Sequence, residues 1–126
     1  MSKEKKQDIW YPDEKLVDTI HDTMIEKYGG WKGYERGVNV FSYILEEVKE
    51  IEGIYKKAAF LLRNIVSRRI YIDGNHRTAQ GVTQTFLEVN NLQMKINDTE
   101  EIISFIKHIL LYNIDEIAEW LENGTT

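Results

Sequence analysis

The sequence predicts a single all-α domain, folded as a compact bundle of about six helices. Its 126 residues suit one domain that is long enough to bury a core. Apolar residues recur three or four positions apart along nearly the whole chain, which is the period of amphipathic helices. The chain has one proline and no proline- or serine-rich linker that would divide it. We expect residues 1–8, which are polar, to be a flexible N-terminus, and residues 9–126 to form the domain.

The first helix is expected to begin at Pro12, because proline suits the first position of a helix. Asp13 and Glu14 follow, and acidic residues in a first turn interact favourably with the helix dipole. The apolar residues at helical spacing are Leu16, Val17, Ile20, Met24, Ile25 and Tyr28. The pair Gly29 and Gly30 is expected to end this helix.

Three further helices follow a glycine-rich loop. Residues 29–37 contain four glycines and therefore predict a loop. Helices are predicted over residues 38–51, 54–68 and 76–90, and Gly53 separates the first two of these. One face of the helix over 54–68 carries Ile54, Ala58, Leu61, Leu62, Ile65 and Val66, and the next helix is expected to bury Ala79, Val82, Phe86 and Val89.

Two shorter helices complete the expected bundle. A connector precedes them, in which residues 93–96 suit a short extended piece. Asp98 and Glu101 have the spacing of a capping box, in which the two side chains bond to each other's main-chain N–H groups at a helix start. Asn113 and Glu116 repeat this spacing before the last helix. The fifth helix carries the apolar residues Ile102, Ile103, Ile106, Ile109 and Leu110.

The composition narrows the classes of function. A net charge of −5 argues against sequence-independent nucleic-acid binding, because that affinity depends on neutralising phosphates. The absence of cysteine removes disulfides, thiolate catalysis and cysteine-ligated zinc, and the three histidines do not have the spacing of zinc ligands. No apolar run approaches the ~20 residues of a membrane span, and the charged N-terminus does not resemble a secretory signal. We therefore expect a cytoplasmic protein without a membrane partner.

The segment "RRIYIDGNHRTAQ", residues 68–80, carries the residues with the clearest chemistry. It places Gly74 and Asn75 at the expected start of a helix, where unpaired N–H groups and the helix dipole attract a phosphate. Arg77 can bind phosphate oxygens through two N–H groups, and Asp73 can hold Mg²⁺ that bridges phosphates. Together these residues suit phosphoryl or nucleotidyl transfer. The same residues also suit an ordinary turn and helix cap, and this alternative stays open.

Within this segment, "IYIDGNHRTA" resembles the signature of the Fic/Doc (Fido) proteins. That signature consists of histidine, any residue, phenylalanine, any residue, Asp or Glu, Gly or Ala, Asn, Gly or Lys, and Arg. The resemblance extends over most of the chain. The stretch "YPDEKLVDTIHDTMIEKYGGWKGYERG" is similar to the opening of death-on-curing (Doc) toxins, and "KKAAFLLRNIVSRR" is similar to their helix before the motif. "RTAQGVTQTFLEVNN" and "IDEIAEWLENG" resemble their helix after the motif and their C-terminal helix.

The resemblance implies both a fold and a chemistry. The implied fold is a small α-helical bundle in which the motif loop leads into a central helix. Fic proteins mostly transfer AMP from ATP to a hydroxyl of another protein, whereas Doc-type members transfer phosphate and inactivate a translation factor. By position, Asp73 matches the metal-linked acid and Tyr71 matches the buried phenylalanine. Gly74 and Asn75 match the anion-binding turn, and Arg77 matches the phosphate-binding arginine.

Two positions favour the Doc branch of the family. His76 occupies the position where Doc toxins have lysine and AMP-transferring proteins have glycine. Gln80 occupies the position of a second arginine in the AMP-transferring pattern. The resemblance therefore implies transfer of phosphate in preference to transfer of AMP.

Arg69 departs from the family at the position of the catalytic histidine, which takes the proton from the attacking hydroxyl. Arginine, whose pKa lies above ~12, cannot be that base. Three accounts of the change stay open. In the first, it is an inactivating change in a toxin whose uninhibited form kills its host. In the second, the protein binds a nucleotide without transferring any part of it, and in the third His76 has become the base, because a helix N-terminus favours its neutral form.

Several other residues are candidates for supporting roles. His21 matches a histidine typical of Doc-like first helices, where we expect a structural hydrogen bond, and His108 is expected to be a packed or surface residue. The glycine-rich loop carries Trp31, Tyr34 and Arg36, which are candidates for clamping a target protein. The alternative for Trp31 is that its side chain packs on the core.

The expected function is that of a Doc-like toxin of a toxin–antitoxin pair, with ATP-dependent phosphoryl transfer to a hydroxyl of a translation-factor-type target and with Mg²⁺. Arg69 predicts that this activity is impaired. The sequence has no clear copy of the internal inhibitory motif of Fic proteins, so a separate antitoxin is the expected partner. Such antitoxins lay a helix into a groove on the toxin. The alternatives are a non-catalytic Fido module that binds a nucleotide or a partner, and a protein AMP-transferase.

Overall fold

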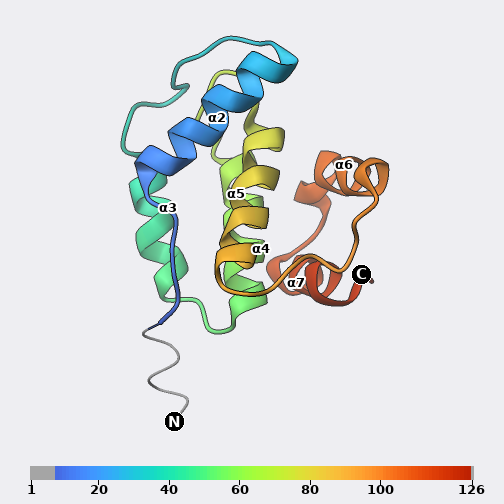
Figure 1. Cartoon of the computed structure of the whole chain (residues 1–126). Helices are drawn as coiled ribbons and strands as arrows, with labels where there is room; N and C mark the ends of the chain where they lie inside the picture. The colour runs from blue at the N-terminus through green and yellow to red at the C-terminus, as the bar shows by residue number, and fades with distance from the viewer. Residues whose placement is uncertain (1–7, 126) are drawn as a thin grey trace.

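The computed structural model describes residues 8–125, and every regular element in this range is a helix (Figure 1). The elements are α2 (Glu14–Tyr28), α3 (Val40–Lys49), α4 (Ile54–Ser67), α5 (Asn75–Val89), α6 (Thr99–Lys107), the 3-10 helix η1 (Ile109–Leu111) and α7 (Ile114–Asn123). The expected all-α bundle of about six helices is confirmed. Most of the expected flexible N-terminus, residues 1–7, lies outside the described range, and Asp8 is an exposed turn residue.

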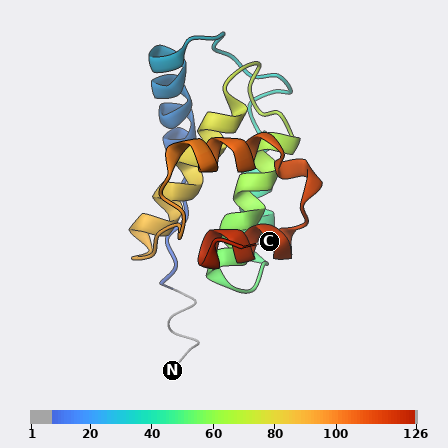
Figure 2. The same ribbon diagram turned by 90° about the vertical axis from the view of Figure 1, so that its right-hand side faces the viewer.

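Helices α4 and α5 form the centre of the bundle. α4 packs against α3, α5 and α7, and α5 packs also against α2 and α6. Figure 1 shows α2 and α3 on one side of this central pair and α6 and α7 on the other. In Figure 2, α6 crosses in front of the central pair. The helix that follows the motif is therefore central, and its N-terminus lies between α2 on one side and α6 on the other.

The core is built from the apolar faces of the two central helices. Their fully buried side chains include Ala58, Ala59, Leu61, Leu62 and Ile65 of α4 and Ala79, Val82, Phe86 and Leu87 of α5. One expected core residue is wrong, because Val89 lies in the last turn of α5 and is 49% exposed. Full burial of each large apolar side chain contributes about 1.5–3 kcal/mol, so this interface holds α5 firmly against α4.

Capping side chains set where α2 and α7 begin. Asp13 caps α2, since its Oδ1 accepts the N–H of Leu16 at 2.8 Å, and the helix begins after it. The expected start at Pro12 is therefore two residues too early. The capping box of α7 is confirmed, with Asn113 and Glu116 each bonded to the other's main-chain N–H.

Three other expected boundaries differ from the structure. The helix expected over residues 38–51 spans only Val40–Lys49. The fifth helix ends at Lys107, and the chain then tightens into η1. Residues 93–96 are not a strand, because no neighbouring strand pairs with them in the described range; the N–H of Lys95 instead bonds to the carbonyl of Leu121 at 2.9 Å. Among residues 8–125, no helix has the length and apolar character that crossing a membrane requires.

Candidate functional site

The turn between α4 and α5 is held in shape by a buried asparagine. The Oδ1 atom of Asn75 accepts the N–H of Tyr71 at 3.0 Å, and its Nδ2 donates to the carbonyl of Tyr71 at 2.7 Å. Gly74 is the N-cap of α5 with φ +81°, a left-handed conformation that glycine adopts without strain. The side chain of Asn75 is thus occupied inside the protein. Gly74 and Asn75 can offer an anion only the main-chain N–H groups of the helix start.

Tyr71 connects the turn to α2. Its ring stacks on the ring of His21 with centroids 3.6 Å apart, and its hydroxyl donates to Asp18 at 2.5 Å. Burial and the carboxylate of Asp18 raise the pKa of Tyr71. The Nε2–H of His21 donates to the carbonyl of Asp73 at 2.8 Å, which is the structural hydrogen bond expected for this histidine. The motif turn is therefore fixed to α2 at two points, Tyr71 and Asp73.

The glycine-rich loop is attached to the motif by its main chain. The N–H of Glu35 bonds to the carbonyl of Ile70 at 2.9 Å, and the N–H of Ile72 bonds to the carbonyl of Gly33 at 3.1 Å. The Tyr34 hydroxyl donates to Asp18 at 2.5 Å, and this hydrogen bond is the main reason that the pKa of Tyr34 rises to about 12. The Tyr34 hydroxyl is therefore turned toward α2.

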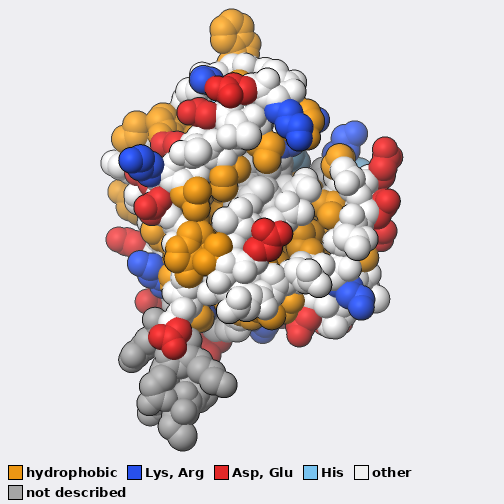
Figure 3. Space-filling view, viewed as in Figure 1, with side chains coloured by type: hydrophobic (Ala, Val, Ile, Leu, Met, Phe, Trp, Pro, Cys, Tyr) orange, Lys and Arg blue, Asp and Glu red, His pale blue; other side chains and the backbone are white. Residues whose placement is uncertain are grey.

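The two other loop candidates lie on the surface. The side chain of Trp31 is 75% exposed, so the alternative that it packs on the core is wrong. Arg36 is also exposed. Figure 3 shows apolar side chains at the top of the molecule, above the end of α2 and the loop that follows. Trp31 and Arg36 stay candidates for contacting a partner.

Asp73 lies between the loop and the start of α5. Its Oδ2 accepts the main-chain N–H of Trp31 at 2.8 Å, and its Oδ1 makes no hydrogen bond within the described residues. The approach requires Gly30, because a Cβ atom there would lie 3.1 Å from the Cβ of Asp73. Residues 8–125 hold no group of three or more His, Cys, Asp or Glu side chains that could bind a metal. One free carboxylate oxygen suits Mg²⁺, which takes most of its other ligands from water and phosphates.

Arg77 lies on the α2 side of the α5 N-terminus. Its guanidinium carbon is 3.9 Å from the centre of the Tyr28 ring, a cation–π contact between α5 and the last residue of α2. Both side chains are exposed. The contact orients the guanidinium without neutralising it, so Arg77 keeps its charge available for an anion.

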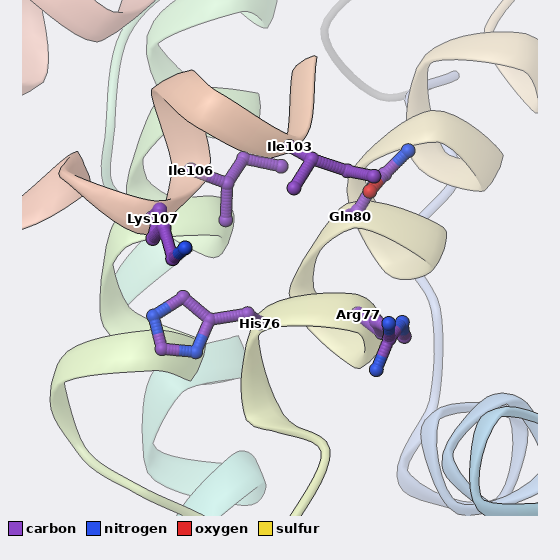
Figure 4. Close-up of a pocket in the computed structure, with 6 residues that line it drawn as sticks. All are labelled: His76, Arg77, Gln80, Ile103, Ile106 and Lys107. Atoms are coloured by element: carbon purple, nitrogen blue, oxygen red, sulfur yellow. The ribbon is translucent and has the colours of Figure 1, made fainter. Parts of the chain in front are cut away.

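A pocket of about 250 Å³ opens between the start of α5 and helix α6 (Figure 4). Its lining residues are His76, Arg77 and Gln80 of α5 and Ile103, Ile106 and Lys107 of α6. Figure 4 shows the His76 ring and the Lys107 side chain on the same side of the pocket, with Arg77 on the other side. The lining thus combines an apolar wall with basic groups and contains no carboxylate. Asp73 and Gly74 are not among the lining residues.

Lys107 and the isoleucines of α6 were not predicted to take part in the site, although the isoleucines were expected on the apolar face of their helix. A lysine in the last turn of a helix is an ordinary partner of the helix dipole, so Lys107 carries no local sign of a site. Ile103 is 48% exposed, although its spacing in the helix is that of a core residue. The pocket can be recognised only from the tertiary structure, because its apolar wall comes from α6 and most of its polar groups come from α5.

Arg69 lies in the motif turn with an exposed side chain and a left-handed backbone, φ +48°. Non-glycine residues adopt this region rarely. The nearby positive charge of Arg69 affects His76, whose pKa is lowered, first by partial burial and second by Arg69. His76 is therefore kept neutral to lower pH than an ordinary histidine.

We expect the His76 imidazole to titrate below its ordinary value of 6.5 and the Arg69→Asn variant to raise that midpoint. The measurement is a pH titration of the histidine ring signals by NMR. Arg36→Asn, which removes a charge from the exposed loop, is the matched control and is expected to leave His76 unchanged. Because the folded chain binds this proton less readily than the unfolded chain, stability should fall as pH drops through 6.5. A midpoint at or above 6.5 would contradict the expected neutral state.

No protein-family model matches the chain, and no protein of curated function matches it.

Proposed function

We propose that the protein is a Doc-like Fido domain that binds a nucleoside triphosphate at the N-terminus of α5 and derives from a phosphotransferase toxin. The observation that carries this proposal is the pocket lined by His76, Arg77 and Lys107 beside the start of that helix. Free N–H groups and the dipole of α5 add positive potential at the same place. In a chain with net charge −5, such a concentration of positive charge favours an anionic ligand.

The shape of the pocket adds to the case for a nucleotide. Ile103 and Ile106 form an apolar wall on which a nucleobase or ribose can rest, and the side chain of Gln80 supplies both a donor and an acceptor. The phosphates would lie between Arg77 and Lys107, which bear the charges on opposite sides of the pocket. A simple inorganic anion would contact the basic side chains but would leave the apolar wall of Ile103 and Ile106 without a partner.

Asp73 lies outside the pocket lining, so it would hold Mg²⁺ on phosphates that extend beyond the pocket toward the start of α5. When bound, Mg²⁺ would neutralise part of the phosphate charge. The free Oδ1 atom of Asp73 and the position of this residue just before α5 fit the role of a ligand to Mg²⁺.

Arg69 limits what the site can do with a protein hydroxyl. A guanidinium keeps its protons at any physiological pH, so it cannot accept one from the attacking group. Its charge near His76 also favours bound phosphate. The proposed ancestral reaction, phosphoryl transfer to a translation-factor-type target under control of an antitoxin, is therefore impaired in this chain. A Fido module that only holds a nucleotide is the second candidate, and the same charge favours it.

Binding of Mg²⁺–ATP, measured by calorimetry, tests the proposed site. We expect Arg77→Gln and Lys107→Gln each to weaken ATP binding by about tenfold, because each removes a charge-assisted contact with phosphate. Lys56→Gln is the matched control: Lys56 pairs with Asp115 near the other end of α4 and should have no effect. Absence of ATP binding, or equal affinity in all variants, would overturn the proposal.

A further inference from the structure

His76 has the environment of an acceptor group. His76 lines the pocket but is exposed to solvent, and within residues 8–125 its ring makes no hydrogen bond and no ion pair. Figure 4 shows the ring directed away from α5, on the side where Lys107 approaches. Partial burial and the charge of Arg69 favour its neutral form. A neutral imidazole has one ring nitrogen with a free lone pair, and here no protein group occupies it.

The lone pair of His76 could serve a general base or a nucleophile, and the charges around the ring affect these two roles differently. A general base must become a positively charged imidazolium, which the nearby charge of Arg69 disfavours. General bases are also usually oriented by a third group, and the pocket lining has no carboxylate to do so. A nucleophile that attacks a phosphoryl group also takes positive charge on its ring until its other N–H proton leaves, but it gains a negatively charged phosphate in the same step. Arg69 near the ring and Lys107 in the same pocket can stabilise that phosphate.

We propose that His76 is itself a phosphoryl acceptor, modified by the nucleoside triphosphate that binds in the pocket. The ring nitrogen forms a bond to the γ-phosphorus, the bond from that phosphorus to the bridging oxygen breaks, and the nucleoside diphosphate leaves with the electron pair. The proton on the other ring nitrogen is released to water. The products are phosphohistidine, nucleoside diphosphate and one proton. This inference rests on the proposed nucleotide site.

Transfer to His76 would not need the base that Arg69 has replaced. A hydroxyl must lose its proton as it attacks, and Arg69 cannot take that proton. A neutral imidazole attacks through a lone pair and needs no base for this step. The replacement that impairs transfer to a hydroxyl therefore leaves transfer to His76 open, and it adds a cation beside the product.

The test is self-labelling of the purified chain with Mg²⁺ and ATP labelled at the γ-phosphate. We expect label on the chain that is lost in acid and kept in alkali, as a phosphorus–nitrogen bond requires, and an increase in intact mass equal to one phosphoryl group. ATP labelled at the α-phosphate should leave the chain unlabelled. His76→Gln should abolish the label. His108→Gln is the matched control, because His108 is exposed and lies outside this pocket, and it should label fully.

The outcomes separate this inference from the proposed function. ATP binding by the unaltered chain without self-labelling would overturn the acceptor role of His76 and leave the nucleotide site standing. Absence of ATP binding would overturn both. Label that survives acid, or that persists in His76→Gln, would place the phosphate on another residue and contradict the inference. Calorimetry on His76→Gln must show that ATP still binds, so that lost label reports lost chemistry; if the variant no longer binds ATP, the acceptor role is rejected in favour of a binding role.

Discussion

Histidine in place of Arg69 is expected to raise phosphoryl transfer from ATP to protein hydroxyls by about 10²- to 10⁴-fold, the usual contribution of a positioned general base. The variant supplies a proton acceptor in the motif turn just after α4, at a position whose charge acts on His76 of the proposed phosphate site. The fold should tolerate it, because residue 69 is exposed and histidine is among the residues that adopt a left-handed backbone more readily. The expected product is an acid-stable phosphate ester on a protein other than the chain itself.

The measurement is transfer of label from ATP to proteins of a cell extract, with Mg²⁺, by the unaltered chain and by Arg69→His. Arg69→Asn is the matched control, since it also removes the cation and suits the left-handed backbone but supplies no base. Label from the γ-phosphate would identify phosphoryl transfer, and label from the α-phosphate would identify AMP transfer. Equal transfer by the unaltered chain would make Arg69 compatible with catalysis. If Arg69→His binds ATP but transfers no label, the result would favour a module that binds a nucleotide without transferring any part of it.

Alanine in place of Asn75 is expected to lower the free energy of unfolding by about 2–6 kcal/mol. The side chain is buried and satisfies both the N–H and the carbonyl of Tyr71. Alanine leaves both buried groups without a partner, and each unpaired group costs about 1–3 kcal/mol. Because the same turn carries Asp73 and Gly74, the loss should also weaken ATP binding.

Urea unfolding followed by circular dichroism measures this change. Asn113→Ala is the matched control: it removes the exposed cap of α7 and should cost only about 1 kcal/mol. Asn75→Asp should fall between the two, because it keeps the acceptor for the Tyr71 N–H and loses the donor to the carbonyl. An effect of Asn75→Ala no larger than that of Asn113→Ala would show that the turn does not depend on this side chain.

Patterns within short stretches predicted most of the fold correctly. The apolar faces of α4 and α5 and the capping box of α7 depend on residues three or four positions apart, and these relations survive in any helical context. The errors arise where a local preference competes with another interaction. Pro12 suits a first helical position, but Asp13 provides a side-chain cap and sets the start of α2 later. Residues 93–96 suit a strand, but no strand lies beside them in the described range.

The candidate site was predicted only in part. The motif placed Asp73, His76 and Arg77 near one helix start, as found, because they are neighbours along the chain. It did not indicate that the side chain of Asn75 points inward or that Asp73 accepts the N–H of Trp31. Those contacts depend on side-chain directions and on segments distant in sequence, which a local pattern does not contain.

By itself, the sequence determined the all-α class, the two central amphipathic helices and the motif residues. The tertiary structure alone decided which groups share one pocket. Lys107 lines the same pocket as His76 because α6 packs across α5, while the carboxylate of Asp73 stays outside the pocket lining, bonded to the loop after α2. The physical reason is that helix periodicity is set by hydrogen bonds between near neighbours, whereas the crossing of two helices is set by how all their buried side chains pack together.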